Sequence, residues 1–311
     1  YFLRAGDSDP ILPGLVPGVS YERRFTPDLI GGQGTLRFDL LGVNRSSTSL
    51  IDSNADGVID GRDVGRLTFG VDWRRQTVLS NGMVLGVAAG LNGALYRIGQ
   101  DPTFGASVSR MTPTLAVDLR WPWVKSASGG HSSQVIEPVL QLVWSDASNT
   151  SVPNEESSLV EFDEGNLFSF SRFPGSDLYE SGLRANIGVN WTRKDPDGWT
   201  LGVTAGRVLR SEDLGQFSTG SRLSGTRSDW LLAMQIRADN GLSVTNRALF
   251  DDSLEFSKSE LRLSFGQQRY SLAGNYVWLV ADPAEGRPLA TSELALDAAL
   301  RLSDSWVVTG T

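Results

Sequence analysis

Six residues between positions 52 and 63 offer oxygen atoms at the spacing of a calcium-binding loop. Carboxylate or amide side chains stand at loop positions 1, 3, 5, 9 and 12, and a glycine stands at position 6, where such a loop turns sharply. The backbone carbonyl at position 7 would add a further oxygen. The candidate ligands of Ca²⁺ are Asp52, Asn54, Asp56, Val58, Asp60 and Asp63.

The sequence around this loop leaves two interpretations open. Position 12 is Asp63 in place of the usual glutamate, as in the dockerin variety of the EF-hand loop. Strand-like rather than helical segments flank the loop, and Asp, Asn and Gly are also ordinary turn-forming residues. The segment is therefore either a calcium site that makes a long connection rigid or a solvated acidic loop. No cofactor is required in our interpretation, and Ca²⁺ in loop 52–63 is the one candidate.

The composition leaves little room for catalysis or for nucleic-acid binding. The chain has no cysteine and a single histidine, His131, which lies in a Gly/Ser-rich stretch and would be the only imidazole base for a Ser–His mechanism. It carries 28 Lys+Arg against 36 Asp+Glu, and its formal net charge of −8 disfavours a nucleic-acid partner. We therefore predict a protein that is not an enzyme and binds no nucleic acid.

The dominant pattern of the sequence is an alternation of apolar and polar residues with a period of two. From 183 to 192 the odd positions are apolar and the even positions are polar or glycine, and 199–206 repeats this pattern. Successive side chains of a β-strand point to opposite faces, so each segment has one apolar and one polar face. We count about 14 such segments, near 14–25, 33–44, 64–79, 83–98, 108–123, 134–146, 180–194, 199–210, 227–238, 242–251, 256–266, 269–281, 288–302 and 305–311.

The length of these segments and the position of their aromatic residues favour a bilayer over water. Many segments reach ten residues, whereas strands of soluble sheets cluster near five or six and a tilted strand that crosses a bilayer needs about 9–11. We therefore predict an all-β fold, a large antiparallel transmembrane β-barrel of the outer-membrane type, present here as a partial barrel of about 14 strands. A soluble β-sandwich alternates in the same way and is the alternative. Tryptophans near segment ends resemble an aromatic girdle: Trp73, Trp121, Trp123, Trp191, Trp199 and Trp230.

The connections between the segments alternate in length, as in outer-membrane barrels with short periplasmic turns and long outer loops. The short turns lie at 80–82, 195–198, 239–241, 266–268 and 303–305. The longer links are 45–63, 99–107, 147–179, 211–226 and 282–287. Two prolines, Pro122 and Pro138, fall inside predicted strands. Because proline cannot donate a ladder hydrogen bond, we expect bulges or loosened pairing there.

Several short motifs resemble the barrel of the LPS-assembly protein LptD family. The resemblance spans roughly 10–210 and rests on Ile11-Leu12-Pro13-Gly14-Leu15-Val16-Pro17, Leu95-Tyr96, Arg110-Met111-Thr112-Pro113, Ile136-Glu137-Pro138, Phe162-Asp163, Leu167-Phe168 and Arg172-Phe173-Pro174-Gly175-Ser176-Asp177. The chain departs from the family pattern at Pro174, where a serine is usual, and at Leu178, where an arginine is usual. It also lacks the cysteines that link barrel and N-terminal domain in well-studied members.

The resemblance implies transport rather than chemistry. Members of this family pass lipopolysaccharide into the outer leaflet of the outer membrane of Gram-negative bacteria, receive it from the periplasmic Lpt bridge through a jellyroll domain, and are plugged by the lipoprotein LptE where it exists. Residues 1–311 would then be a portion of one transmembrane barrel domain. We expect the jellyroll domain and the first and last strands to lie outside this chain, so the resemblance assigns no gate residue here.

The resemblance also singles out one loop. Its family-motif residues are Phe168, Arg172, Phe173, Gly175 and Asp177. We expect this loop to pack as a plug at the outer mouth of the barrel, and direct contact with lipid is the alternative. Other functions remain open at this point: an outer-membrane porin or substrate importer, an outer-membrane hydrolase, which a lone histidine disfavours, and a soluble calcium-dependent glycan-binding β-protein.

Overall fold

The chain forms a single antiparallel β-sheet in its computed structural model, which describes residues 11–54, 57–126, 132–146, 150–283 and 287–310. Sixteen strands are assigned in this part of the chain, and each pairs with its sequence neighbour or next neighbour. The strands are β1 Pro13–Leu15, β2 Gly18–Phe25, β3 Gln33–Arg45, β4 Asp63–Val78, β5 Val84–Gly99, β6 Ser107–Arg120, β7 Trp123–Ser126, β8 Ser133–Ser145, β9 Gly182–Asp195, β10 Trp199–Arg210, β11 Trp230–Ala238, β12 Leu242–Phe250, β13 Phe256–Gly266, β14 Tyr270–Leu279, β15 Thr291–Ser303 and β16 Trp306–Gly310.

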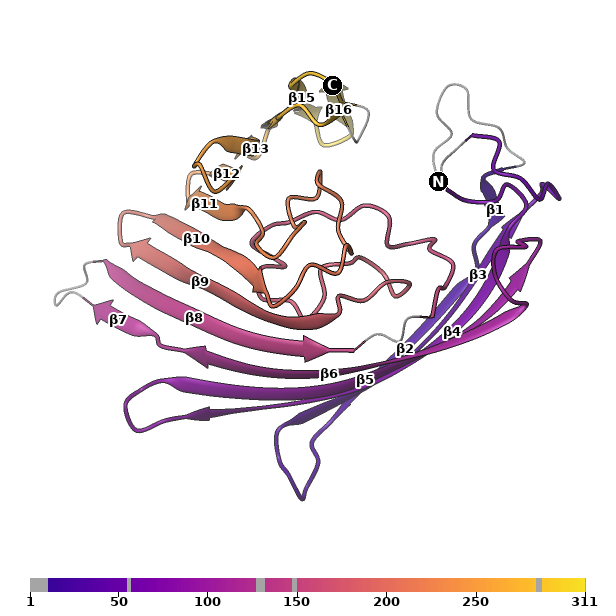
Figure 1. Cartoon of the computed structure of the whole chain (residues 1–311). Helices are drawn as coiled ribbons and strands as arrows, with labels where there is room; N and C mark the ends of the chain where they lie inside the picture. The colour runs from indigo at the N-terminus through magenta and orange to yellow at the C-terminus, as the bar shows by residue number, and fades with distance from the viewer. Residues whose placement is uncertain (1–10, 55–56, 127–131, 147–149, 284–286, 311) are drawn as a thin grey trace.

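The sheet curls into a trough whose concave side holds the long connections (Figure 1). Its order runs from β1 and β2, both paired to β3, to β16, and within the described ranges no pairing joins these two edges. The wall is therefore an open segment of a barrel. All 14 segments predicted from the alternation correspond to strands, which confirms the predicted antiparallel sheet of the outer-membrane type. The short strands β1 and β7 are additional because two non-strand dipeptides, Val16–Pro17 and Trp121–Pro122, each separate a short strand from its longer neighbour.

The two faces of the wall have the reverse of the polarity expected in water. In β4, Arg66 is 5% exposed, whereas its neighbours Leu67 and Val71 are 40% and 42% exposed. On β6, Leu115 and Val117 are likewise about half exposed on the outer, convex face. An apolar surface of this extent is unfavourable in water and suits acyl chains. No helix in the described part of the chain is long and apolar enough to span a bilayer.

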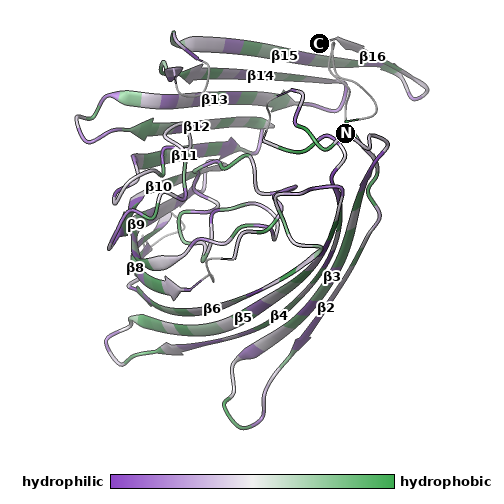
Figure 2. Cartoon of the chain, turned by 45° about the vertical axis from the view of Figure 1, so that its right-hand side comes forward, coloured by the Kyte–Doolittle hydropathy of each residue, from purple (hydrophilic) through white to green (hydrophobic). Residues whose placement is uncertain are grey.

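The short turns all lie at one edge of the wall. Three of them place a glycine in the left-handed region that tight hairpins require: Gly82, Gly198 and Gly241 have φ of 82°, 85° and 89°. The same edge carries the β2–β3 loop, residues 26–32, which projects at the bottom of the wall in Figures 1 and 2. The long connections 46–62, 146–181 and 211–229 leave from the opposite edge. This sorting matches the short turns and long loops at opposite edges of outer-membrane barrels.

Pro122 and Pro138 lie next to one another at an interruption of the ladder. β6 pairs with β8 up to Arg120 opposite Val139, and β7 resumes with Trp123 opposite Ile136, so the register is the same on both sides of the gap. The Trp121 N–H still donates to the Pro138 carbonyl (3.1 Å). Because Pro138 has no N–H, it cannot return that bond. The prolines thus open the pairing locally without a bulge.

Candidate functional site

The candidate site is the plug formed by residues 150–181, which fold back from the outer edge onto the concave face of the wall (Figure 1). Polar side chains that point inward from the strands meet this segment. Because period-two alternation places arginines on that inner face at several strands, the wall presents a set of fixed cations. Carboxylates of the plug face these cations in three buried clusters, and Glu164 of the plug accepts two hydrogen bonds from Arg247 of β12 (2.6 and 2.8 Å) at a more exposed position.

The first cluster is centred on Asp177, which is 1% exposed. Its Oδ1 accepts hydrogen bonds from Arg66 Nη1 (2.5 Å) and from the Tyr96 hydroxyl (3.1 Å). Its Oδ2 accepts the backbone N–H groups of Glu155 (2.7 Å) and Glu156 (3.0 Å). One carboxylate thus joins β4, β5 and the two ends of the plug. Four donors to one buried carboxylate make this a charge-assisted, fully satisfied network.

Arg110 of β6 adds a second attachment at the same place. Its Nη1 donates to the Asp177 carbonyl (2.5 Å) and its Nη2 donates to the Ser176 carbonyl (3.0 Å). The neighbouring Gly175 has φ of 65°, and a Cβ there would lie 2.5 Å from Glu156 Cβ. Only glycine fits this turn without strain, because the left-handed conformation and the close contact both exclude a side chain.

The second cluster places three guanidinium groups around one carboxylate that is fully buried, Glu180. Glu180 Oε2 accepts from Arg172 Nη1 (2.6 Å) and lies 3.8 Å from Arg184 Nε. Glu180 Oε1 accepts from Arg210 Nε (3.0 Å) and Nη2 (2.8 Å). Arg172 also donates to the Asn186 side chain (2.6 Å). Burial alone would raise the pKa of Glu180, but the three cations outweigh it and lower that pKa below its usual value.

The third cluster fixes the start of the plug to the β3–β4 connection. Glu155 accepts from Arg45 Nη2 (2.8 Å) and from Arg62 Nε (2.8 Å), and all three side chains are almost wholly buried. Arg62 also lies 3.5 Å from Asp101. Together the three clusters tie residues 155–180 to strands on either side of the trough.

Apolar packing fills the space that the charges leave. Leu167 is fully buried against the inner face of β9 and β10, where Gly188 and Gly206 stand directly opposite one another. A Cβ at Gly206 would lie 2.7 Å from Leu167 Cδ2, so the two glycines form a flat seat for this side chain. Phe173 stacks on Phe217 of the 211–229 connection, with ring centroids 4.7 Å apart. These contacts belong to an apolar core between plug and wall, whose buried side chains are Phe162, Leu167, Val208, Leu223, Leu231 and Leu249.

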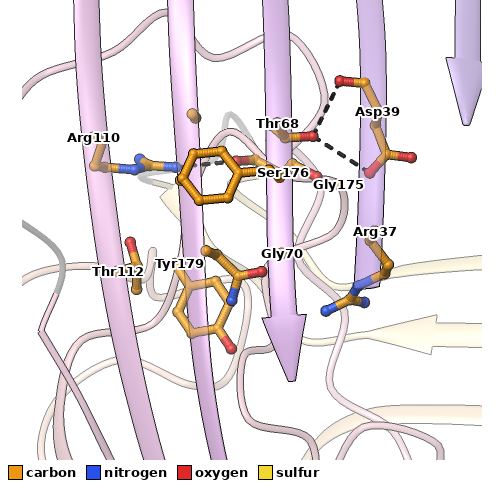
Figure 3. A pocket seen from close by; sticks show the side chains of 13 residues that line it. Arg37, Asp39, Thr68, Gly70, Arg110, Thr112, Gly175, Ser176 and Tyr179 are labelled. Atoms are coloured by element: carbon orange, nitrogen blue, oxygen red, sulfur yellow. Dashed lines mark hydrogen bonds between the residues drawn. The ribbon is translucent and has the colours of Figure 1, made fainter. Parts of the chain in front are cut away.

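A cavity of about 140 Å³ remains between the plug and the wall (Figure 3). Strands β3 to β6 form its floor, and Gly175, Ser176 and Tyr179 of the plug cover it. Several polar groups around it bond to neighbours: Thr68 Oγ1 to Asp39 (3.4 Å), Arg37 to Asp72 and Arg110 to the Ser176 carbonyl (3.0 Å). The cavity contains neither cysteine nor histidine among its lining residues. Its chemistry suits hydration or hydrogen bonding to a polar solute rather than catalysis.

The residues selected from the family motif take different parts in the plug. Arg172 and Asp177 are at the centres of two clusters, Gly175 makes the turn between them, and Phe168 and Phe173 pack on its apolar side. Sequence reasoning did not select Glu180, Glu155 or the inward arginines. The arginines do carry a signal, since each occupies a polar-face position of a predicted strand. Glu155 and Glu180 carry none, because their partners lie far away in the sequence.

The structure describes only part of the predicted calcium loop, since Asp56 lies outside the described residues, as does His131. Asp52 Oδ2 accepts the Gly57 N–H (2.8 Å), and Asp60 Oδ1 accepts the Ser53 N–H (3.0 Å). Asp63 stands at the start of β4 and accepts from the Arg45 N–H (2.9 Å). In the described residues no group of three or more acidic or His side chains is arranged to hold a metal. Calcium binding by the loop stays a prediction, to be tested by calorimetry with and without Asp56→Ala; no heat from either protein would contradict it.

Comparison with known proteins supports one family. Among protein-family models, LptD, described as LPS transport system D, matches residues 16–306. A search of curated proteins finds no match. Among solved structures the chain is similar to the crystal structure of the siderophore receptor PirA from Pseudomonas aeruginosa, with 11% sequence identity and a TM-score of 0.40. That likeness covers 94% of this chain and 60% of the receptor's chain. Because the family match extends over nearly the whole sequence, the chain belongs to the LptD family.

Proposed function

We propose that this chain is part of the outer-membrane channel that transports lipopolysaccharide into the outer leaflet of a Gram-negative outer membrane. The observation that carries the proposal is the family match over residues 16–306 on a wall that is apolar outside and polar inside. Transport of this kind makes and breaks no covalent bond. The cavity and clusters of the plug agree with that, because their ionisable groups are engaged with one another.

The uncovered part of the inner wall supports a further element of the proposal. The inward side chains of β15 are mostly exposed in the chain alone, whereas the plug covers those in the outer parts of β4 and β9. A hydrophilic surface facing the lumen is where a plug lipoprotein such as LptE would pack, and where the saccharide part of the cargo would pass. Delivery from the periplasmic Lpt bridge would use a jellyroll domain outside residues 1–311.

Depletion of the protein in cells tests the proposed cargo. We expect newly made lipopolysaccharide to accumulate before the outer leaflet, and we expect plasmid-borne protein to restore its surface exposure. The measurement is the fraction of pulse-labelled lipopolysaccharide that a non-permeant reagent modifies on intact cells. Normal labelling after depletion, together with loss of uptake of a small solute, would favour the porin or importer alternative.

Photo-crosslinking tests which face of the wall the cargo contacts during transport. A photoreactive residue at Arg262, on the inner face of β13, is expected to give lipopolysaccharide adducts during transport. The matched control carries the photoreactive residue in place of Leu263, which is 45% exposed on the outer face. Adducts at neither position would contradict passage along this wall. Solubility of the purified protein without detergent would contradict the membrane assignment itself.

A further inference from the structure

Two pairs of adjacent arginines lie near the turn edge of the wall, Arg23-Arg24 in β2 and Arg74-Arg75 in β4. Because neighbouring residues of a strand point to opposite faces, each pair has one outward and one inward member. In the ladder, Arg23 stands opposite Leu36, which stands opposite the outward-facing Val71. Arg75 follows Val71 and Trp73 on the same outer row. Arg23 and Arg75 therefore face outward, and Arg24 and Arg74 face the lumen.

The inward and outward arginines differ in their partners. Arg24 Nε donates to Glu22 Oε1 (2.8 Å), and Arg74 donates through Nε and Nη2 to Gln33 Oε1 (3.1 and 2.7 Å). Arg75 donates only to the Ile30 carbonyl (3.0 Å), and in the described part of the chain Arg23 has no hydrogen bond or ion pair with another side chain. The wall thus presents two positive charges without a carboxylate partner on the face that meets lipid.

An outward arginine elsewhere on the same edge differs from Arg23 and Arg75. Arg193 of β9 donates to Asp195 (2.9 Å), and its guanidinium lies 5.1 Å from the centroid of the Trp199 ring. Its charge is therefore compensated within the wall. Arg23 and Arg75 lack such compensation within the described chain, so both guanidinium groups are free to pair with an anion from outside it.

The surroundings of these two arginines are apolar and fixed in place. The Phe25 ring covers Gly34, whose added Cβ would lie 2.5 Å from it. Trp73 Nε1 donates to the Gly31 carbonyl (2.8 Å), and this bond and that of Arg75 hold the 26–32 loop against β4. The loop displays a fully exposed Leu29 and a half-exposed Ile30 at the turn edge. Aromatic and aliphatic groups beside cations at this height are typical of a membrane interface.

We propose that Arg23 and Arg75, together with Phe25, Leu29, Ile30 and Trp73, bind an anionic glycerophospholipid of the periplasmic leaflet. The guanidinium groups would donate charge-assisted hydrogen bonds to the lipid phosphate, and the leucine–isoleucine tip would lie among the acyl chains. This site goes beyond the proposed transport function and does not depend on the cargo, because it lies on the outer surface of the wall.

A fluorescent probe at the loop tip tests the site. The chain has no cysteine, so Leu29→Cys introduces a single thiol into it for a polarity-sensitive dye. The purified full-length protein is placed in nanodiscs of phosphatidylethanolamine and phosphatidylglycerol, with bromine quenchers on one lipid or the other. We expect a lipid-like emission and stronger quenching by the brominated phosphatidylglycerol. Emission typical of water, or equal quenching by the two lipids, would overturn the proposal.

The adjacent arginines supply matched controls. We expect R23Q/R75Q to lower the preference for the anionic lipid by about fivefold for each arginine, and R24Q/R74Q to leave it unchanged. R23K/R75K should keep most of the preference, which separates loss of charge from loss of folding. High salt should weaken it, since surface electrostatics are screened. An equal loss in R23Q/R75Q and R24Q/R74Q, or an unchanged preference in R23Q/R75Q, would contradict the site.

Discussion

The plug covers one half of the wall and leaves the other half more open. Both halves have polar side chains on the inner face, but these side chains find their partners in different ways. In the plugged half, Arg172, Arg184 and Arg210 are buried around the single carboxylate of Glu180. In the more open half, Glu260 of β13 bonds to Lys258 (2.7 Å) and to Arg247 (2.8 Å) and stays 21% exposed. The plug reaches this group only through Glu164, which is 34% exposed and accepts from Arg247 (2.6 Å). Both halves read as polar inner faces in the sequence.

The comparison shows how burial changes the contribution of an ion pair to stability. Where water can reach a charge, its pairing contributes little, because hydration is an equally good alternative. Where a loop has displaced the water, each cation needs a specific partner, and removing that partner leaves an uncompensated buried charge. The plugged half should therefore respond strongly to single substitutions that the open half tolerates.

The largest effect is expected for Glu180→Gln. This change leaves three buried guanidinium groups without their carboxylate, and we expect the free energy of unfolding to fall by about 3–5 kcal/mol. Urea unfolding of the purified protein in detergent, followed by tryptophan fluorescence, measures it. Glu161→Gln is the control, since Glu161 is 69% exposed and lies 4.0 Å from Lys258. A loss of similar size in both variants would remove the distinction between buried and exposed pairs.

Acid should also lower the free energy of unfolding, by no more than the substitution Glu180→Gln does. The cations around Glu180 hold its pKa below the usual value, against the opposing influence of burial. A group with a lowered pKa in the folded state contributes stability that is present above its unfolded pKa and is lost as the pH falls through its folded pKa. We expect the urea midpoint to fall below about pH 4 more steeply in the parent protein than in Glu180→Gln. Parallel pH profiles would contradict the assignment.

A smaller effect is expected where the plug meets the sheet through glycine. Gly206→Ala would place a Cβ 2.4 Å from the Ile187 carbonyl oxygen and 2.7 Å from Leu167 Cδ2, and such overpacking costs about 1–3 kcal/mol. Gly202→Ala, on the same face of β10, meets nothing within 4 Å and should be neutral or slightly stabilising. The measurement is the unfolding midpoint of each variant, one changed where the plug covers β10 and the other where it does not. A neutral Gly206→Ala would contradict the close approach of both the Ile187 carbonyl and Leu167 at this position.

The smallest effect is expected in the open half. Glu260→Gln removes one carboxylate from a partly exposed group of charges, and we expect a loss of about 1 kcal/mol or less. Raising the salt concentration should reduce the difference between this variant and the parent, whereas the effect of Glu180→Gln should persist. A loss in Glu260→Gln as large as that in Glu180→Gln would contradict the link between burial and the contribution of these ion pairs.

Much of the wall could be predicted from the sequence because its signal is local. Alternation, as in 183–192, fixes both strand and face, and turn residues such as Gly198 and Gly241 mark the hairpins. The plug could be predicted only in part. The motif around Arg172 and Asp177 located it, but its partners come from strands that are close in space and remote in sequence. Neither period nor spacing shows which carboxylate meets which arginine.

The interruption at Pro122 was predicted as a weakness in pairing, but its form was not. A proline removes one donor, and the sequence pattern does not show whether the strand then bulges or simply leaves a gap. Here the register continues unchanged across the gap, because the same alternation on both sides keeps Leu119 and Trp123 on the outer face.

The contact between Arg66 of β4 and Asp177 joins residues 111 positions apart, and strands β5 to β8 lie between them in the sequence. A slip of one residue at any of these pairings would turn a whole strand over and send its inward cation toward lipid. The plug can therefore close only over correctly assembled strands. Its buried ion pairs therefore stabilise the native register over any register shifted by one residue.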